Sequence, residues 1–162
     1  MAISSSNIFN IEGIRLPADA FVVLVRTSWN ADIVDELEKG CISVLSQNNI
    51  RFQVIKVPGA FEIGFAIRAC WDHGTRPDAF IALGCILRGD TPHFDYVCSA
   101  VTDNIAQLNI SLSVPVIFGV LTVDNQQQAI DRTGGIHGHK GEEAASTAIQ
   151  MISLVRDLKN NK

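Results

Sequence analysis

The strongest fold signal in this sequence is the segment Ala79-Phe80-Ile81-Ala82-Leu83-Gly84-Cys85-Ile86-Leu87-Arg88-Gly89-Asp90-Thr91-Pro92-His93. A continuous apolar run of this kind is typical of a strand that is buried on both faces of a parallel sheet. The polar, glycine-containing turn ends the strand, and a proline is well tolerated in the first turn of a helix. The segment therefore predicts a strand over 80–87 and a helix from Pro92 to about Asn109.

Strand and helix patterns alternate on both sides of this segment. Strands are predicted at 20–25, 51–57 and 114–121, the first and last of them as continuous apolar runs. Apolar residues at helical spacing predict helices at 30–47, 60–73, 124–131 and 142–158, with Asn30 and Asp124 as N-caps. Such alternation predicts a flavodoxin-like, three-layer α/β/α sandwich whose four-stranded parallel sheet has the order 2-1-3-4.

Two segments have no clear regular pattern. Residues 1–19 are mixed and polar, with Ile8, Phe9, Ile11 and Ile14 scattered among them, and are expected to form an arm that packs on a neighbouring subunit. Residues 132–141 form a glycine-rich basic link before the last helix. Neither segment divides the chain, so residues 1–162 are expected to form one domain.

The composition restricts the function classes. The chain has 162 residues, is 47% hydrophobic and 19% charged, and has a net charge of −4 with no basic run. Nucleic-acid binding is disfavoured because neutralising a phosphate backbone needs clustered Lys and Arg. No apolar run approaches the roughly 20 residues that span a bilayer, and no signal peptide is apparent, so a cytoplasmic protein without membrane contact is expected.

The cysteines and histidines give little support for a metal site. Cys41, Cys70, Cys85 and Cys98 form no C-x-x-C pair, which favours reduced thiols in a compact core. His137 and His139 are only two positions apart, a spacing that places them on different sides of any helix. No metal site is therefore expected.

The residues that could carry chemistry lie at the carboxyl ends of the predicted strands. Ligands bind at this edge of open α/β sheets. Trp29 follows the first strand and could stack on a planar ring or cover the core. Glu62, at a helix start, could accept hydrogen bonds from a ligand or interact favourably with the helix dipole. Ala60 and Phe61 precede it, and Phe118 belongs to the fourth strand.

The turn at 88–93 offers backbone N–H groups at a helix start, which suit an anion such as phosphate. His93 adds a side chain that exchanges protons near neutral pH, although a surface histidine is the simpler interpretation. Arg132 and Lys140 enclose the glycine-rich link and could bind phosphate or be solvated charges. The glycines match neither the Walker nor the Rossmann pattern.

Three segments together resemble the 6,7-dimethyl-8-ribityllumazine synthase family: Val57-Pro58-Gly59-Ala60-Phe61-Glu62, Arg88-Gly89-Asp90-Thr91-Pro92-His93-Phe94-Asp95-Tyr96-Val97, and Pro115-Val116-Ile117-Phe118-Gly119-Val120-Leu121-Thr122. The similarity covers nearly the whole chain from about Phe21. It implies a cofactor-free condensation of 5-amino-6-(D-ribitylamino)uracil with 3,4-dihydroxy-2-butanone 4-phosphate in riboflavin biosynthesis.

The resemblance also implies roles for individual residues. Trp29 stacks on the pyrimidine, and His93 carries protons. Asp90 and Thr91 meet the phosphate, while Phe118 and Arg132 reach in from a neighbouring subunit. The remaining substrate-binding residues implied by the resemblance are Ala60, Phe61, Glu62, Cys85, Ile86, Leu87 and Lys140.

A site of this kind implies a homopentamer as the catalytic unit, and the family includes both pentamers and sixty-subunit capsids. The link before the last helix lacks a long insertion, which favours a capsid, and riboflavin synthase is a candidate partner.

Two other functions compete with catalysis: a flavin-binding protein without turnover and a purely structural shell. His93 and Arg132 favour the enzyme, because neither alternative needs them. Three positions hold residues other than those that are common in the family: Gly64, Ile136 and His139.

Overall fold

The computed structural model describes residues 10–16 and 18–160. Strands β1 (Phe21–Thr27), β2 (Arg51–Val57), β3 (Ala79–Leu87) and β4 (Val116–Val123) form one parallel sheet in the order β2-β1-β3-β4. The predicted strand order and sheet type are therefore confirmed. Strand β4 lies at one edge of the sheet, where it pairs only with β3.

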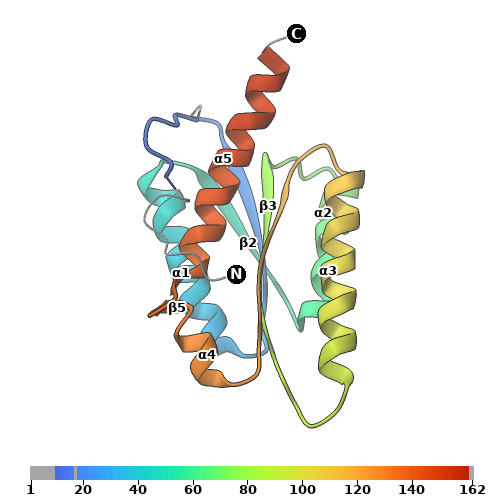
Figure 1. The fold of residues 1–162 in the computed structure, drawn as a ribbon. Helices are drawn as coiled ribbons and strands as arrows, with labels where there is room; N and C mark the ends of the chain where they lie inside the picture. The colour runs from blue at the N-terminus through green and yellow to red at the C-terminus, as the bar shows by residue number, and fades with distance from the viewer. Residues whose placement is uncertain (1–9, 17, 161–162) are drawn as a thin grey trace.

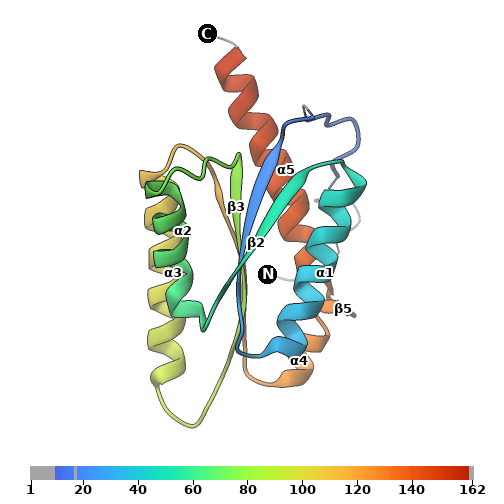
Figure 2. The ribbon, with the colours of Figure 1, turned by 180° about the vertical axis from the view of Figure 1, so that it is seen from behind.

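Helices cover both faces of the sheet (Figures 1 and 2). One face carries α1 (Ala31–Gln47) and α5 (Lys140–Asn160), and the opposite face carries α2 (Ile63–Asp72) and α3 (His93–Ser111). A single 3-10 turn, η1 (Ala60–Glu62), precedes α2, and the short helix α4 (Gln126–Ile130) follows β4. This is the predicted three-layer α/β/α sandwich.

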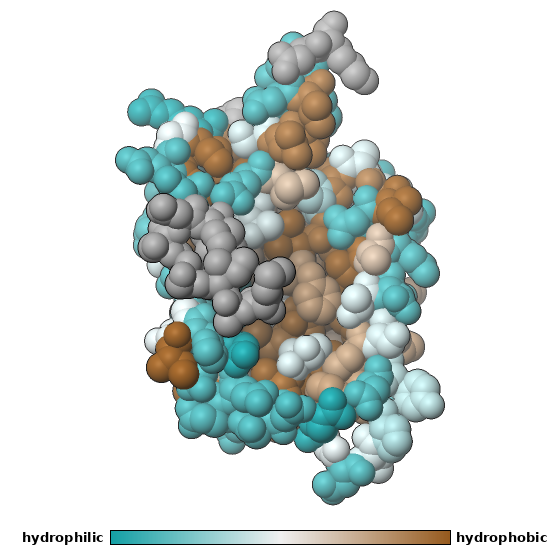
Figure 3. Space-filling model, in the orientation of Figure 1, coloured by the Kyte–Doolittle hydropathy of each residue, from teal (hydrophilic) through white to brown (hydrophobic). Residues whose placement is uncertain are grey.

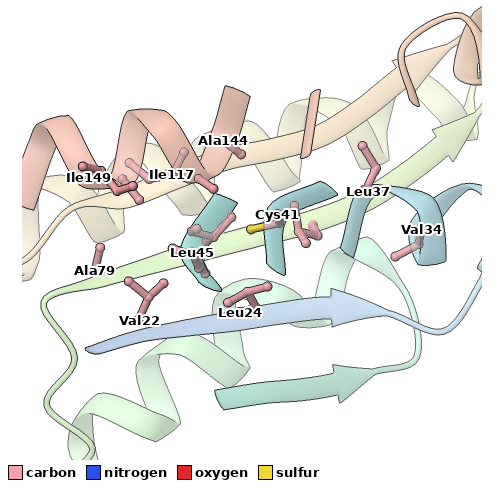
Figure 4. Packing of buried hydrophobic residues seen from close by; sticks show 14 of the residues in the cluster. Val22, Leu24, Val34, Leu37, Cys41, Leu45, Ala79, Ile117, Ala144 and Ile149 are labelled. Atoms are coloured by element: carbon pink, nitrogen blue, oxygen red, sulfur yellow. The ribbon is translucent and has the colours of Figure 1, made fainter. Parts of the chain in front are cut away.

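The core consists of two apolar layers, one on each side of the sheet. Leu24 of β1 packs with Leu37 and Leu45 of α1 on one side, and Figure 4 shows their side chains converging between the sheet and the helices. On the other side, Phe80 packs with residues of α2 and α3, including Ile63. Strands β1 and β3 contribute to both layers, which explains why their apolar runs are continuous.

Helices α1 and α5 approach each other closely because glycines lie at their contact. A Cβ atom on Gly141 would be 2.0 Å from the backbone oxygen of Leu37, and one on Gly40 would be 2.1 Å from the His139 ring. The Nδ1 atom of His139 is buried and has no hydrogen-bond partner among the described residues. Only glycine fits at these two positions with the present packing.

Two local predictions were wrong, and a third is confirmed only in position. The glycine-rich link contains a small antiparallel hairpin, β5 (Thr133–Gly135) and β6 (Gly138–His139), which lacks the apolar alternation that would reveal it. Asn125, and not Asp124, caps α4 by accepting a hydrogen bond from the backbone N–H of Gln128. Asn30 occupies the N-cap position of α1, but its side chain makes no capping hydrogen bond.

The described part of the N-terminal arm packs on its own chain. Ile11, Ile14 and Leu16 lie against the layer formed with α1 and α5, so these residues supply no argument for contact with another subunit. Ile8 and Phe9 fall outside the described residues. Across residues 10–16 and 18–160, every helix is too short or too polar to cross a bilayer.

Candidate active site

A cavity of about 430 Å³ lies at the carboxyl ends of β1 and β3, between η1 and the start of α3. Its lining includes nine of the thirteen residues predicted for the site: Trp29, Ala60, Phe61, Glu62, Cys85, Ile86, Leu87, Thr91 and His93. These residues come from separate segments that the parallel sheet brings to one edge. A cavity of this size can hold a small organic ligand.

Trp29 forms one wall of the cavity. Its backbone N–H donates to the carbonyl of Pro58 over 3.0 Å, which ties the end of β1 to the loop after β2. The indole ring lies against Gly59, where a Cβ atom would be 2.7 Å from the ring, and its side chain is 68% exposed. The ring is therefore held in place yet free to stack on a ligand, and it does not cover the core.

The η1 turn supplies the neighbouring wall. The Glu62 carboxylate accepts a hydrogen bond of 3.0 Å from the backbone N–H of Gly59, so this side chain stabilises its own turn. Phe61 stays 57% exposed and lines the cavity. The turn thus presents an apolar ring and a half-buried carboxylate to the same space.

The turn after β3 closes the opposite end of the cavity. Gly89 and Thr91 line it, and His93 is the first residue of α3. The Thr91 hydroxyl accepts a long hydrogen bond of 3.4 Å from the backbone N–H of His93. A helix N-terminus with an adjacent hydroxyl favours an anion, and the His93 imidazole lies beside it.

Asn30 is a cavity residue that the sequence interpretation missed, since it was assigned only to capping. Its side-chain N–H donates to the backbone carbonyl of Cys85 over 2.8 Å, and its own backbone is left-handed with φ of 55°. Asparagine adopts this conformation more readily than most residues. Its position after a strand end was the signal that could have identified it.

Cys85 contributes to the cavity as a neutral thiol. Burial raises the pKa of the Cys85 thiol to about 11, so a thiolate nucleophile is disfavoured at neutral pH. Its carbonyl is the atom that Asn30 fixes. Cys85 therefore shapes the wall of the cavity, and no nucleophilic role is needed.

Four of the predicted residues lie outside this cavity. Asp90 is in the same turn but does not line it. Phe118 and Lys140 line a separate groove over β4 and α5, and Lys140 pairs with Glu143 at 2.6 Å. Arg132 follows α4 and donates to the carbonyl of Gln128 over 2.8 Å. The chain's own cavity therefore joins the aromatic wall formed by Trp29 and Phe61 to the turn at 89–93, here called the anion turn, without these four side chains.

The arrangement suits a reaction between a planar ring and an anionic partner. Trp29 and Phe61 provide aromatic surface at one end, and the turn at 89–93 provides backbone donors at the other. Among the described residues, no three His, Cys, Asp or Glu side chains gather as metal ligands would. His93 supplies the imidazole among the side chains that line this cavity.

Comparison with known proteins identifies the family. Residues 19–156 match the family model described as 6,7-dimethyl-8-ribityllumazine synthase. The chain is 45% identical over 134 residues to the 6,7-dimethyl-8-ribityllumazine synthase of Parabacteroides distasonis, covering 81% of this chain and 83% of that protein. It is 44% identical over 151 residues to the enzyme of the same name from Porphyromonas gingivalis, covering 91% of this chain and 93% of that protein. This chain belongs to the 6,7-dimethyl-8-ribityllumazine synthase family.

Proposed function

We propose that this protein condenses 5-amino-6-(D-ribitylamino)uracil with 3,4-dihydroxy-2-butanone 4-phosphate to form 6,7-dimethyl-8-ribityllumazine, phosphate and water. The observation that carries the proposal is the cavity itself, which places the exposed Trp29 ring opposite the anion turn at 89–93. The family membership supplies the identity of the two substrates. The 19–156 match also supports treating residues 1–162 as one domain.

The reaction can be followed through the residues of the cavity. The aryl amine attacks the ketone of the phosphorylated substrate, and water leaves to give an imine. Proton removal then expels phosphate and gives an enol, which ketonises before the second amine closes the ring with loss of water. His93 acts as the proton carrier, while Trp29 and Phe61 hold the ring against the reacting partner.

The phosphate group belongs at the start of α3. Gly89 and Thr91 line that end of the cavity, and the backbone of Asp90 lies between them. Backbone N–H groups and the positive helix end stabilise the phosphate as a leaving group. No cofactor is assigned, because each step is an addition, a proton transfer or a loss of water or phosphate.

We propose that a second copy of the chain completes this site in a pentamer. Phe118, Arg132 and Lys140 lie away from their own chain's cavity, as side chains offered to a neighbour would. Figure 3 shows an apolar, hollowed surface over β4, between α5 and α3. Contiguous exposed apolar surface of this kind favours a protein contact. A capsid of pentamers is the larger assembly that we expect.

The cellular setting and the partner proteins follow from the same proposal. All four cysteines are free thiols, which favours the reducing cytoplasm. Riboflavin synthase is the proposed partner, because it would consume the lumazine product.

The proposal is tested by mixing the purified protein with both substrates and recording lumazine absorbance and phosphate release together. One phosphate is expected per lumazine, at a rate well above the uncatalysed reaction. His93→Asn should slow turnover by roughly 10² or more, the usual contribution of a general acid or base. A wild-type rate equal to the uncatalysed background would refute the function.

A further inference from the structure

Arg88 lies between β3 and the turn at 89–93. It is the first residue after β3, and its backbone N–H donates to the carbonyl of Val123 at the end of β4 over 2.9 Å. Its side chain is 42% exposed and does not line the cavity. Arg88 is thus adjacent to the proposed phosphate site without facing into it.

The guanidinium of Arg88 joins three elements. Its Nε donates to Oδ1 of Asp124, just after β4, over 2.7 Å, and its Nη2 lies 3.2 Å from Oδ1 of Asp95 in α3. The guanidinium carbon also lies 4.0 Å from the centre of the Phe94 ring, which is buried in the core. A planar, forked cation can make these three contacts at once, whereas a lysine ammonium cannot.

The contacts of Arg88 with Asp124, Asp95 and Phe94, here called the clasp, join the two ends of the anion turn. Arg88 precedes the turn, while Phe94 and Asp95 follow it, so the side-chain contacts join the two ends of residues 89–93. Residues 89–93 are all exposed, and a Cβ atom on Gly89 would have no neighbour within 4 Å, so packing contributes little to holding this turn. Anchoring both ends is therefore the means by which this loop keeps one conformation.

We propose that Arg88 is a positioning residue that holds the turn at 89–93, and with it Thr91 and His93, in the geometry that binds the phosphorylated substrate. The inference rests on the proposed function of the same cavity. A direct phosphate contact is the competing role for a cation at this place. The two carboxylates already occupy the guanidinium, which favours positioning.

The test compares Arg88→Gln and Asp124→Asn in the full-length protein with wild type. KM for each substrate, kcat and the inhibition constant of inorganic phosphate are measured by lumazine absorbance. Both variants should raise KM for the phosphorylated substrate and the phosphate inhibition constant about fivefold, since partly exposed ion pairs each contribute modestly. KM for the pyrimidine should stay within about twofold, because Trp29 is held by a different loop.

The matched control is Arg68→Gln, which breaks an ion pair of similar length, 2.8 Å from Nε of Arg68 to Asp72, away from the cavity. It should change none of these constants. Unfolding midpoints of all variants are recorded, and if Arg88→Gln does not fold, Asp124→Asn and Asp95→Asn carry the test.

Two results would overturn the inference. Tighter phosphate binding in Asp124→Asn would mean that Arg88, once released from its carboxylate, binds phosphate directly. Unchanged constants in Arg88→Gln would mean that the clasp has no role in binding. Both are read against a wild-type protein that makes lumazine, so they are distinct from failure of the proposed function, in which wild type itself makes none.

Discussion

Replacing Trp29 by alanine should weaken pyrimidine binding with little effect on folding. An aromatic side chain of this size has about 150–250 Å² of surface to bury, and Trp29 is 68% exposed in the free chain. If a stacked pyrimidine covers about half of the exposed part, roughly 50–85 Å² is removed from water, worth about 1.3–2.1 kcal/mol at 25 cal/mol per Å². Base stacking on aromatic side chains contributes a similar ~1–3 kcal/mol.

A loss of about 2 kcal/mol corresponds to a roughly thirtyfold higher KM for the pyrimidine substrate. The assay is the initial rate of lumazine absorbance against pyrimidine concentration, with the phosphorylated substrate saturating. Trp29→Phe is the control, since it keeps a ring in place and should stay within about threefold. Unfolding midpoints of the three proteins should agree. A Trp29→Ala variant whose KM lies within twofold of wild type would refute the stacking role.

Two further predictions concern the fold. Gly141→Ala should destabilise the protein by about 3 kcal/mol or more, because the new Cβ would meet the Leu37 carbonyl oxygen at 2.0 Å. Urea unfolding measures this loss. Gly64→Ala is the control, and its unfolding free energy should lie within about 1 kcal/mol of wild type. Burial raises the pKa of Cys41 to about 12 and that of Cys85 to about 11, from an ordinary value of 9.0. Because unfolding frees these thiols to ionise, their stabilising contribution is complete below pH 9 and is lost as the pH rises towards 11–12. Cys41→Ala should therefore reduce the fall in unfolding free energy by about 1.4 kcal/mol per pH unit above pH 9, and an unchanged slope would count against this pKa.

The architecture was predictable because each strand leaves a strong local signal. The apolar runs of β1 and β3 are buried on both faces, and alternation with helices restricts the topology to few choices. The hairpin β5–β6 was not predictable, because its short, glycine-rich strands have no apolar alternation. The confusion of Asp124 with Asn125 at α4 arose because both residue types cap helices equally well.

The site was predictable where it depends on strand ends, and less so where it depends on side-chain direction. Trp29, Glu62 and His93 follow three different strands, and the parallel sheet brings them to one cavity. Asn30 also follows a strand end, but it was assigned only to capping, because its hydrogen bond to the Cys85 carbonyl joins residues that are distant in sequence. Arg132 lies outside its own chain's cavity, as expected for a side chain that the family resemblance assigns to a neighbouring subunit.

Mixing two defective variants shows directly whether the site is built from two copies of the chain, because each variant would then supply the residue that the other lacks. Trp29→Ala removes an aromatic wall of a chain's own cavity, and Arg132→Ala removes the side chain that we propose enters the neighbouring cavity. The two variants are unfolded, mixed in equal amounts and refolded together, and lumazine formation is measured at substrate concentrations below KM.

In a head-to-tail ring, random mixing leaves about one quarter of the sites with both residues intact. The mixture should therefore recover about one quarter of the wild-type rate, whereas each variant refolded alone should stay far below that. A mixture no faster than the average of the two separate variants would contradict a site built from two copies of the chain.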